Sequence, residues 1–142
     1  MKLHLSYAIA LATMTGLTAP AAAQDEPEEP RTTYQVTYLK FAPGADERWN
    51  EMMEENFKPA RKAAGLPEAQ IHWLMDGPWD IMMVTRMPRG LAALDTHASP
   101  ERSAFEKALL AQAGSEDAVT KLNAEYEKLI AENMRVFSHT HP

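Results

Sequence analysis

The sequence predicts a single domain of the α+β class with the element order β-α-β-β-α-β. Short runs rich in aromatic and β-branched side chains, typical of strands, stand at the start, middle and end of the chain. Between them lie longer segments in which apolar residues recur at three- and four-residue steps, as in a helix. Glycine and proline separate the segments, so that the chain itself marks their boundaries.

The first 23 residues are expected to be a cleaved secretory signal. An apolar run follows Lys2, and the small residues AAA precede the expected cut after Ala23. The segment QDEPEEPRT at 24–32 is acidic and proline-rich, and it is predicted to be a disordered linker. The folded domain is therefore expected over 33–142, in a protein that is periplasmic or secreted.

Composition argues against several kinds of partner. The chain has 14 Lys and Arg against 20 Asp and Glu, a formal net charge of −6, and its cations are dispersed among acids. This distribution does not favour nucleic-acid binding. No cysteine is present, so disulfides and lipid attachment through cysteine are excluded. Beyond the signal, no apolar run has the length of a membrane span, and no membrane partner is expected.

The first half predicts a strand followed by a helix. YQVTYLKF, residues 34–41, forms the strand, and Pro43 with Gly44 ends it. The helix that follows ends at Gly65, and Pro59 within it is expected to bend its axis. Its apolar stripe comprises Trp49, Met52, Met53, Phe57, Ala60 and Ala64.

A hairpin follows, with strands IHWLM at 71–75 and WDIMMVTRM at 79–87 joined by an Asp-Gly-Pro turn. Its register is left open by the sequence. An odd number of loop residues sets His72 beside Met82, and an even number sets it beside Met83.

The second half predicts two helices and a last strand. RGLAALDTH at 89–97 is expected to make a turn or two of helix, and Ser99 followed by Pro100 is a strong helix start. Gly114 ends that helix, and the next one begins directly after it. MRVFSH at 134–139 closes the domain as a strand.

This order predicts a ferredoxin-like fold, a four-stranded antiparallel sheet with helices on one face. The other face also needs a cover, because both alternating sets of strand residues are apolar where a sheet with one wet face would show one polar set. A second copy of the chain is the economical cover. One set holds Val36, Tyr38, Ile71, Trp73, Ile81 and Met83, and the other holds Leu39, Phe41, Leu74, Met82, Val84 and Phe137.

YLKFAPG, the hairpin IHWLMDGPWDIMMV and the terminal LNAEYEKLIAENMRVFSH resemble the dimeric α/β-barrel superfamily over about residues 33–139. The resemblance is closest to small uncharacterised members related to its stress-responsive and NIPSNAP-like branches, among which this chain is expected to be an exported member. It implies two ferredoxin-like protomers that pair their sheets into a homodimeric barrel. The superfamily includes cofactor-free monooxygenases, isomerases, haem-handling enzymes and members without known activity, so the fold alone does not assign a reaction.

Three side chains are candidates for catalysis: His72, Asp80 and Arg86. His72 or Asp80 could act as the base of a cofactor-free oxygenase or isomerase, since neutral imidazole is poised near pH 7. In the structural alternative His72 is a hydrogen-bonded histidine of the sheet, and Arg86 pairs across a dimer. The patterns of hydrolases, kinases and nucleotide-binding proteins do not occur in the sequence.

The leading hypothesis is a binding module that takes a small apolar or aromatic molecule in a cavity between sheet and helices. Aromatic and methionine side chains suit such a wall, although most are also expected in the core. The predicted lining is Tyr38, His72, Trp73, Trp79 and Met82.

A metal-handling alternative depends on the residues left after signal cleavage. Seven of the nine methionines and His72, His97, His139 and His141 suggest periplasmic haem or copper handling, because thioether and imidazole bind copper. Their spacing lacks the repeats of a dedicated site, and core packing accounts for most of the methionines. We therefore predict no metal site and no cofactor, and leave open whether the terminal HTHP binds a metal.

Overall fold

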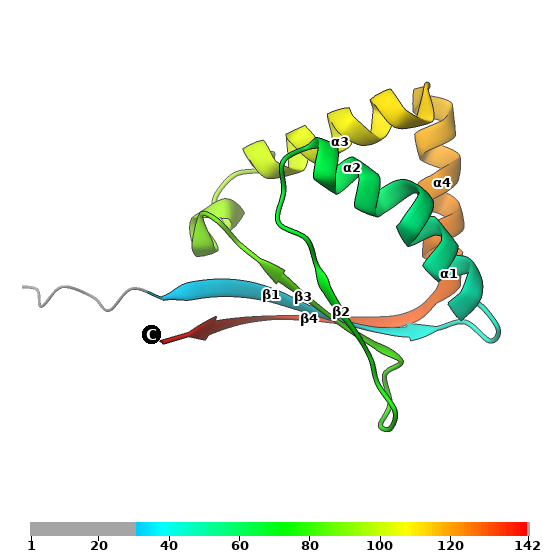
Figure 1. The fold of residues 1–142 in the computed structure, drawn as a ribbon, viewed down its shortest axis with the longest axis horizontal. Coiled ribbons are helices and arrows are strands. Elements are labelled where there is room, and N and C mark those ends of the chain that lie inside the picture. Colours follow the sequence, from blue (N-terminus) through cyan, green and yellow to red (C-terminus); the bar gives the residue numbers. More distant parts are fainter. Residues whose placement is uncertain (1–30, 142) are drawn as a thin grey trace, which may run out of the picture.

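The computed structural model describes residues 31–141, so the expected signal and residues 24–30 of the linker lie outside the described part. Figure 1 shows a twisted sheet with all described helices on one of its faces. None of the helices within 31–141 is long and apolar enough to span a membrane. The elements are β1 Thr32–Phe41, α1 Asp46–Met52, η1 Met53–Phe57, α2 Lys58–Ala63, β2 Gln70–Trp73, β3 Ile81–Arg86, η2 Gly90–Leu94, α3 Pro100–Ala113, α4 Glu116–Leu129 and β4 Ile130–Thr140.

The sheet has the strand order β2-β3-β1-β4, and every neighbouring pair is antiparallel. This confirms the predicted four-stranded antiparallel sheet of a ferredoxin-like kind of fold. β4 begins four residues earlier than expected, because Ile130 directly continues α4 and pairs with Phe41 across a register shift. The long β4 forms one edge of the sheet, and the four-residue β2 forms the other.

The first helical region combines α1, the π-helical turn η1 and α2 without a break. Pro59 lies in the first turn of α2, where its missing N–H is tolerated. The π-helical turn η1 directly precedes this first turn of α2. Ala64 ends α2 and Gly65 takes a left-handed φ of 66°, which confirms the predicted end of the helix.

The two later helices begin at serine caps, and the start at Ser99 confirms the prediction. The Ser99 hydroxyl accepts a hydrogen bond from the Arg102 N–H, and the Ser115 hydroxyl accepts one from the Ala118 N–H. Gly114 has a left-handed φ of 83° at the end of α3, so the chain can turn directly into α4.

The core lies between the sheet and the first helical region. Leu39 and Ile81, paired across β1 and β3, pack with Trp49 and Met53. The Trp49 ring is fully buried, and its centroid lies 5.2 Å from that of Phe41 and 6.1 Å from that of Trp73. The stripe expected for this helix therefore does form the core.

The hairpin has the odd register: His72 pairs with Met82, and Trp73 pairs with Ile81. Because Ile81 faces the core, Trp73 lies on the helix-covered face and His72 on the opposite face. In Figure 1 the loop between β2 and β3 extends beyond the sheet on the side away from the helices.

We predict that Trp49→Ala lowers the free energy of unfolding by about 3 to 5 kcal/mol, because it removes a fully buried ring. Trp73→Ala serves as the matched control, since Trp73 belongs to the same aromatic cluster but is 50% exposed. Urea unfolding of both variants checks this. Equal losses would contradict the placement of the core around Trp49.

Candidate functional site

The face of the sheet away from the helices holds most of the residues proposed for ligand binding. Tyr38 pairs with Met82, which in turn pairs with His72, so the three lie in a row across β1, β3 and β2. The Trp79 ring approaches that of Tyr38, with centroids 6.1 Å apart. These four residues could contact a molecule or a second chain on this open face.

The same geometry corrects their expected position between sheet and helices. Of the five residues, only Trp73 lies on the helix-covered side, where it packs with Phe41 and Trp49. The cause is the strand period of two, which sends neighbours such as His72 and Trp73 to opposite faces. A cavity between sheet and helices must therefore be lined by other residues.

Asp80 is held by backbone contacts at the end of the hairpin. Its Oδ2 accepts a hydrogen bond from the Phe41 N–H at 2.7 Å, and its own N–H donates to the Leu39 carbonyl at 2.9 Å. Its carbonyl accepts from the Leu74 N–H at 2.9 Å. The carboxylate thus fastens the hairpin loop to the end of β1, which is a structural role.

Arg86 ends β3 on the open face, where it pairs with Tyr34 and is exposed. His72 is exposed as well. The three candidate catalytic residues are therefore not gathered in one cleft: Asp80 lies at one end of β3, and Arg86 lies at the other.

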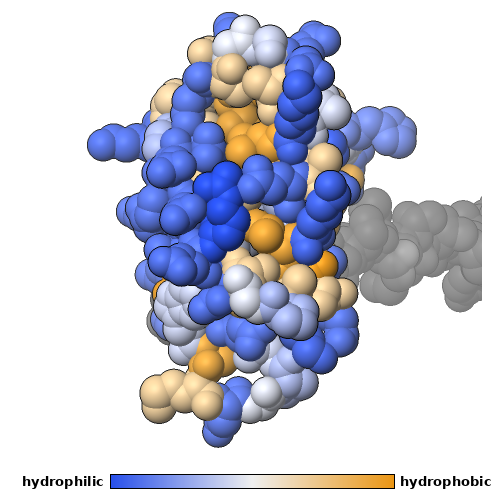
Figure 2. Space-filling model, turned by 90° about the vertical axis from the view of Figure 1, so that its right-hand side faces the viewer, coloured by the Kyte–Doolittle hydropathy of each residue, from blue (hydrophilic) through white to orange (hydrophobic). Residues whose placement is uncertain are grey.

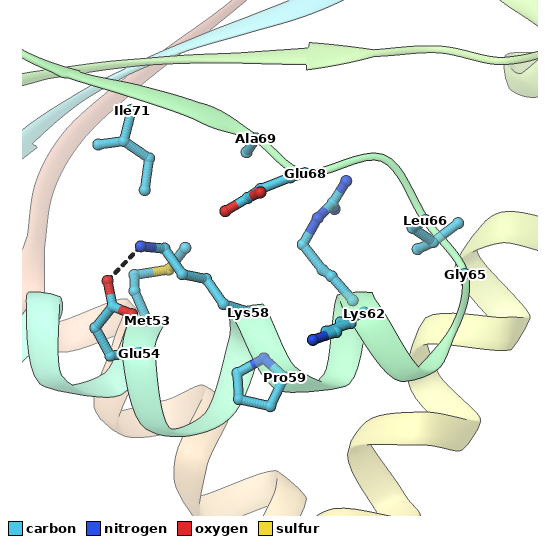
Figure 3. A pocket seen from close by; sticks show the side chains of 11 residues that line it. Met53, Glu54, Lys58, Pro59, Lys62, Gly65, Leu66, Glu68, Ala69 and Ile71 are labelled. Atoms are coloured by element: carbon cyan, nitrogen blue, oxygen red, sulfur yellow. Dashed lines mark hydrogen bonds and ion pairs between the residues drawn. The ribbon is translucent and has the colours of Figure 1, made fainter.

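A groove of about 820 Å³ lies instead between the first helical region and the segment that leads into β2. Figure 3 shows Ile71 and Glu68 directed from this segment into the groove, with Met53 and Lys58 opposite them. Its apolar lining consists of Met53, Pro59, Leu66, Ala69 and Ile71. Such a volume, with apolar walls and a few polar groups, fits a small molecule.

Charged side chains surround these walls. Lys58 forms an ion pair with Glu54. Arg61 donates from Nη2 to the Pro67 carbonyl at 2.7 Å, and its buried Nε has no hydrogen-bond partner among residues 31–141. Burial lowers the pKa of the Arg61 guanidinium, because the surrounding protein stabilises the charge less well than water does.

A second cavity of about 260 Å³ adjoins the groove at Arg61 and Leu66 and reaches Gln35, Thr85 and Phe105. Glu101 lies at its edge, where the Arg89 guanidinium lowers the pKa of that carboxyl to about 2. The ion pair ties η2 to the start of α3 and fixes this boundary of the cavity.

Met53, Pro59 and Ile71 were expected in a helix or a strand, and the sequence did not indicate that they line a groove. One signal was present: α2 has the sequence KPARKA, with three cations and no acid in an otherwise acidic chain. Nothing in the sequence, however, indicated that the segment before β2 would lie opposite this helix.

The end of the molecule where α1 and α4 meet is closed by ion pairs. Arg48 reaches Glu125 on α4 at 2.7 Å and Glu51 on α1 at 2.9 Å. Figure 2 shows this end with hydrophilic side chains over most of its surface and hydrophobic ones between them.

At the other end of β4, the Nε2 atoms of His139 and His141 lie 3.1 Å apart. Across the described residues, no group of three or more His, Cys, Asp or Glu could hold a metal ion. The histidine pair is too small a set for a closed site.

The structure thus defines an α+β protein with a helix-covered antiparallel sheet and a groove beside its β2 edge. A NIPSNAP family protein of unknown function from Agrobacterium tumefaciens str. C58 has a similar fold, with a TM-score of 0.51 and 14% identity over 78% of this chain and 88% of that one. This likeness supports the fold alone.

Two further solved structures are more distant. A second NIPSNAP family protein from Agrobacterium tumefaciens str. C58 gives a TM-score of 0.49 and 12% identity over 82% of this chain and 90% of that one. An uncharacterized NIPSNAP domain protein from Burkholderia xenovorans gives a TM-score of 0.44 and 9% identity over 75% of this chain and 91% of that one. No protein-family model and no curated protein match the sequence.

We predict that Asp80→Ala speeds hydrogen exchange at the Phe41 amide by about tenfold or more, because a charge-assisted hydrogen bond is lost. Asp80→Asn is the matched control, since its side-chain carbonyl can still accept from the same N–H. Exchange is followed by NMR. Unchanged protection in Asp80→Ala would contradict the structural role of Asp80.

Proposed function

We propose that the protein is an exported homodimer that binds a small apolar or aromatic molecule in the groove between α2 and the segment leading into β2. The observation that carries this proposal is the groove itself, about 820 Å³ in volume, with an apolar lining that includes Met53 and Ile71. Its size falls within the range of about 300 to 1,000 Å³ that is usual for ligand sites.

The site favours binding over a reaction. Met53, Leu66 and Ile71 offer dispersion contacts, whereas none of the histidines within the described residues lines the groove. Asp80, the other base proposed from the sequence, is held by the Phe41 N–H at the end of the hairpin and does not line it either. A cofactor-free oxygenase or isomerase would need such a base within reach of its substrate.

A second copy is the proposed cover of the open face. Apolar side chains of all strands but β2 lie on this face, and a sheet face of this kind is stable when it is covered. Two copies related by a twofold axis would apply the same apolar set to each other. The set comprises Tyr34, Val36, Tyr38, Met82, Val84, Met134 and Val136.

The hairpin loop supports the same arrangement. It extends on the open side of the sheet (Figure 1), and Met75 within it is 99% exposed. A loop in this position could contact the partner beside Trp79, which already packs against Tyr38. The export step depends on residues 1–23, which lie outside the described part of the chain.

To test the groove, we choose N-phenyl-1-naphthylamine, a neutral aromatic probe whose fluorescence rises in apolar sites. Ala69→Trp is expected to weaken its binding by about tenfold or more, because the new ring fills space that the probe needs. Ala63→Trp is the matched control, since Ala63 is exposed on α2 and does not line the groove. Equal affinity of Ala69→Trp and the unaltered protein would place the probe elsewhere and refute the proposal.

The dimer is tested by light scattering on the chain without residues 1–23. We expect twice the chain mass for the unaltered protein. Val136→Glu is expected to yield monomers, because the dimer interface would bury two new carboxylates, one from each protomer. Leu110→Glu on α3 is the control, since Leu110 is 37% exposed and Val136 is 39% exposed. A monomer at micromolar concentration before any substitution would rule out the dimer.

A further inference from the structure

Arg61 has unused hydrogen-bonding capacity at the junction of the two cavities. A guanidinium carries five N–H donors, and within the described part of the chain Arg61 makes one hydrogen bond, from Nη2 to the Pro67 carbonyl. Within 31–141 no carboxylate lies within ion-pair distance of Arg61, and its Nε is buried without a partner. A partly buried arginine of this kind is stabilised by an anion placed against it.

The neighbouring cations differ from Arg61 in this respect. Lys58 is paired with Glu54, and Lys62 is exposed on the surface of α2. Arg61 is therefore the cation of the groove that combines partial burial with the lack of an acidic partner. Its position at the end of α2 is also favoured by the helix dipole, but the dipole does not account for the unpaired donors.

The charge of the groove sets how much negative charge a ligand can bring. Its lining includes the cations Lys58, Arg61 and Lys62 and the carboxylates of Glu54 and Glu68. One positive charge is thus in excess, so a single carboxylate would make the groove neutral. Figure 3 shows Glu68 directed into the groove, where it would repel a second negative charge.

Apolar walls adjoin this charged position. Leu66 lies beside Arg61 in the lining of both cavities, while Met53 and Ile71 line the groove farther along the helix. A ligand with a carboxylate at Arg61 could therefore extend an apolar body over these side chains. The planar guanidinium suits a carboxylate because it can donate two parallel hydrogen bonds to it.

We propose that the groove binds a small organic acid with one carboxylate and an apolar body, and that Arg61 holds the carboxylate. This inference rests on the proposed binding function, to which it adds the chemical class of the ligand. It assigns Arg61 the direct contact with the carboxylate.

The first experiment compares two probes of nearly equal shape, 1-naphthylacetate and 1-naphthylacetamide, by titration calorimetry at pH 7. The acid is expected to bind about 10- to 100-fold more tightly than the amide, because it forms charge-assisted hydrogen bonds. This comparison uses the unaltered protein and does not depend on whether a variant folds.

The second experiment tests whether Arg61 causes the preference for the acid over the amide. Arg61→Gln is expected to remove the difference between the two probes, and Arg61→Lys, which keeps the charge but not the planar donors, is expected to reduce it. Lys107→Gln removes an exposed cation of α3 that lines neither cavity, and it is expected to leave the preference within about threefold of its original value. Thermal melting confirms that each variant is folded.

The outcomes separate this inference from the proposed function. If the amide binds as tightly as the acid, or if neither binds while N-phenyl-1-naphthylamine does, the groove remains a binding site but the carboxylate proposal is overturned. Equal loss of preference in Arg61→Gln and Lys107→Gln would likewise overturn the role of Arg61. If none of the three probes binds, the proposed function itself fails.

Discussion

The packing of Trp49 against the paired residues Leu39 and Ile81 is the contact on which the rest of the domain depends. It buries a whole indole ring and joins the first helical region to the two central strands. Since side chains of a strand alternate between faces, it also fixes which residues of every strand meet the helices. Tyr38 and Met82 therefore lie on the opposite face, although both side chains are largely apolar.

Two surfaces with different chemistry result from this division. The open face is apolar and broad, which suits a second protein chain. The groove beside β2 is concave, and it combines apolar walls with a guanidinium whose buried Nε has no hydrogen-bond partner among residues 31–141, which suits a small molecule. Because the two lie on opposite sides of the sheet, a dimer formed through the open face would leave the groove accessible to a ligand.

The π-helical turn η1 helps to bring Arg61 to the groove. One extra residue in a helical turn rotates all later side chains by about 100° relative to a regular α-helix. Met52 and Met53, at the start of this turn, are both buried, and Ala60, which follows the turn, is buried as well. Arg61, next to Ala60, then lies at the border between core and groove, where it is partly desolvated.

The sequence alone determined the order of the elements, the helix ends at Gly65 and Gly114 and the helix start at Ser99, because these follow from local backbone preferences and hydrogen bonds. Tertiary structure decided the hairpin register and hence the face of His72, since the number of unpaired loop residues is not a local property. It also decided the groove, because Arg61 and Ile71 come together only when a helix packs beside the edge of a sheet. Local pattern specifies an element and its apolar side, whereas the partner of each side depends on contacts between residues far apart in the chain.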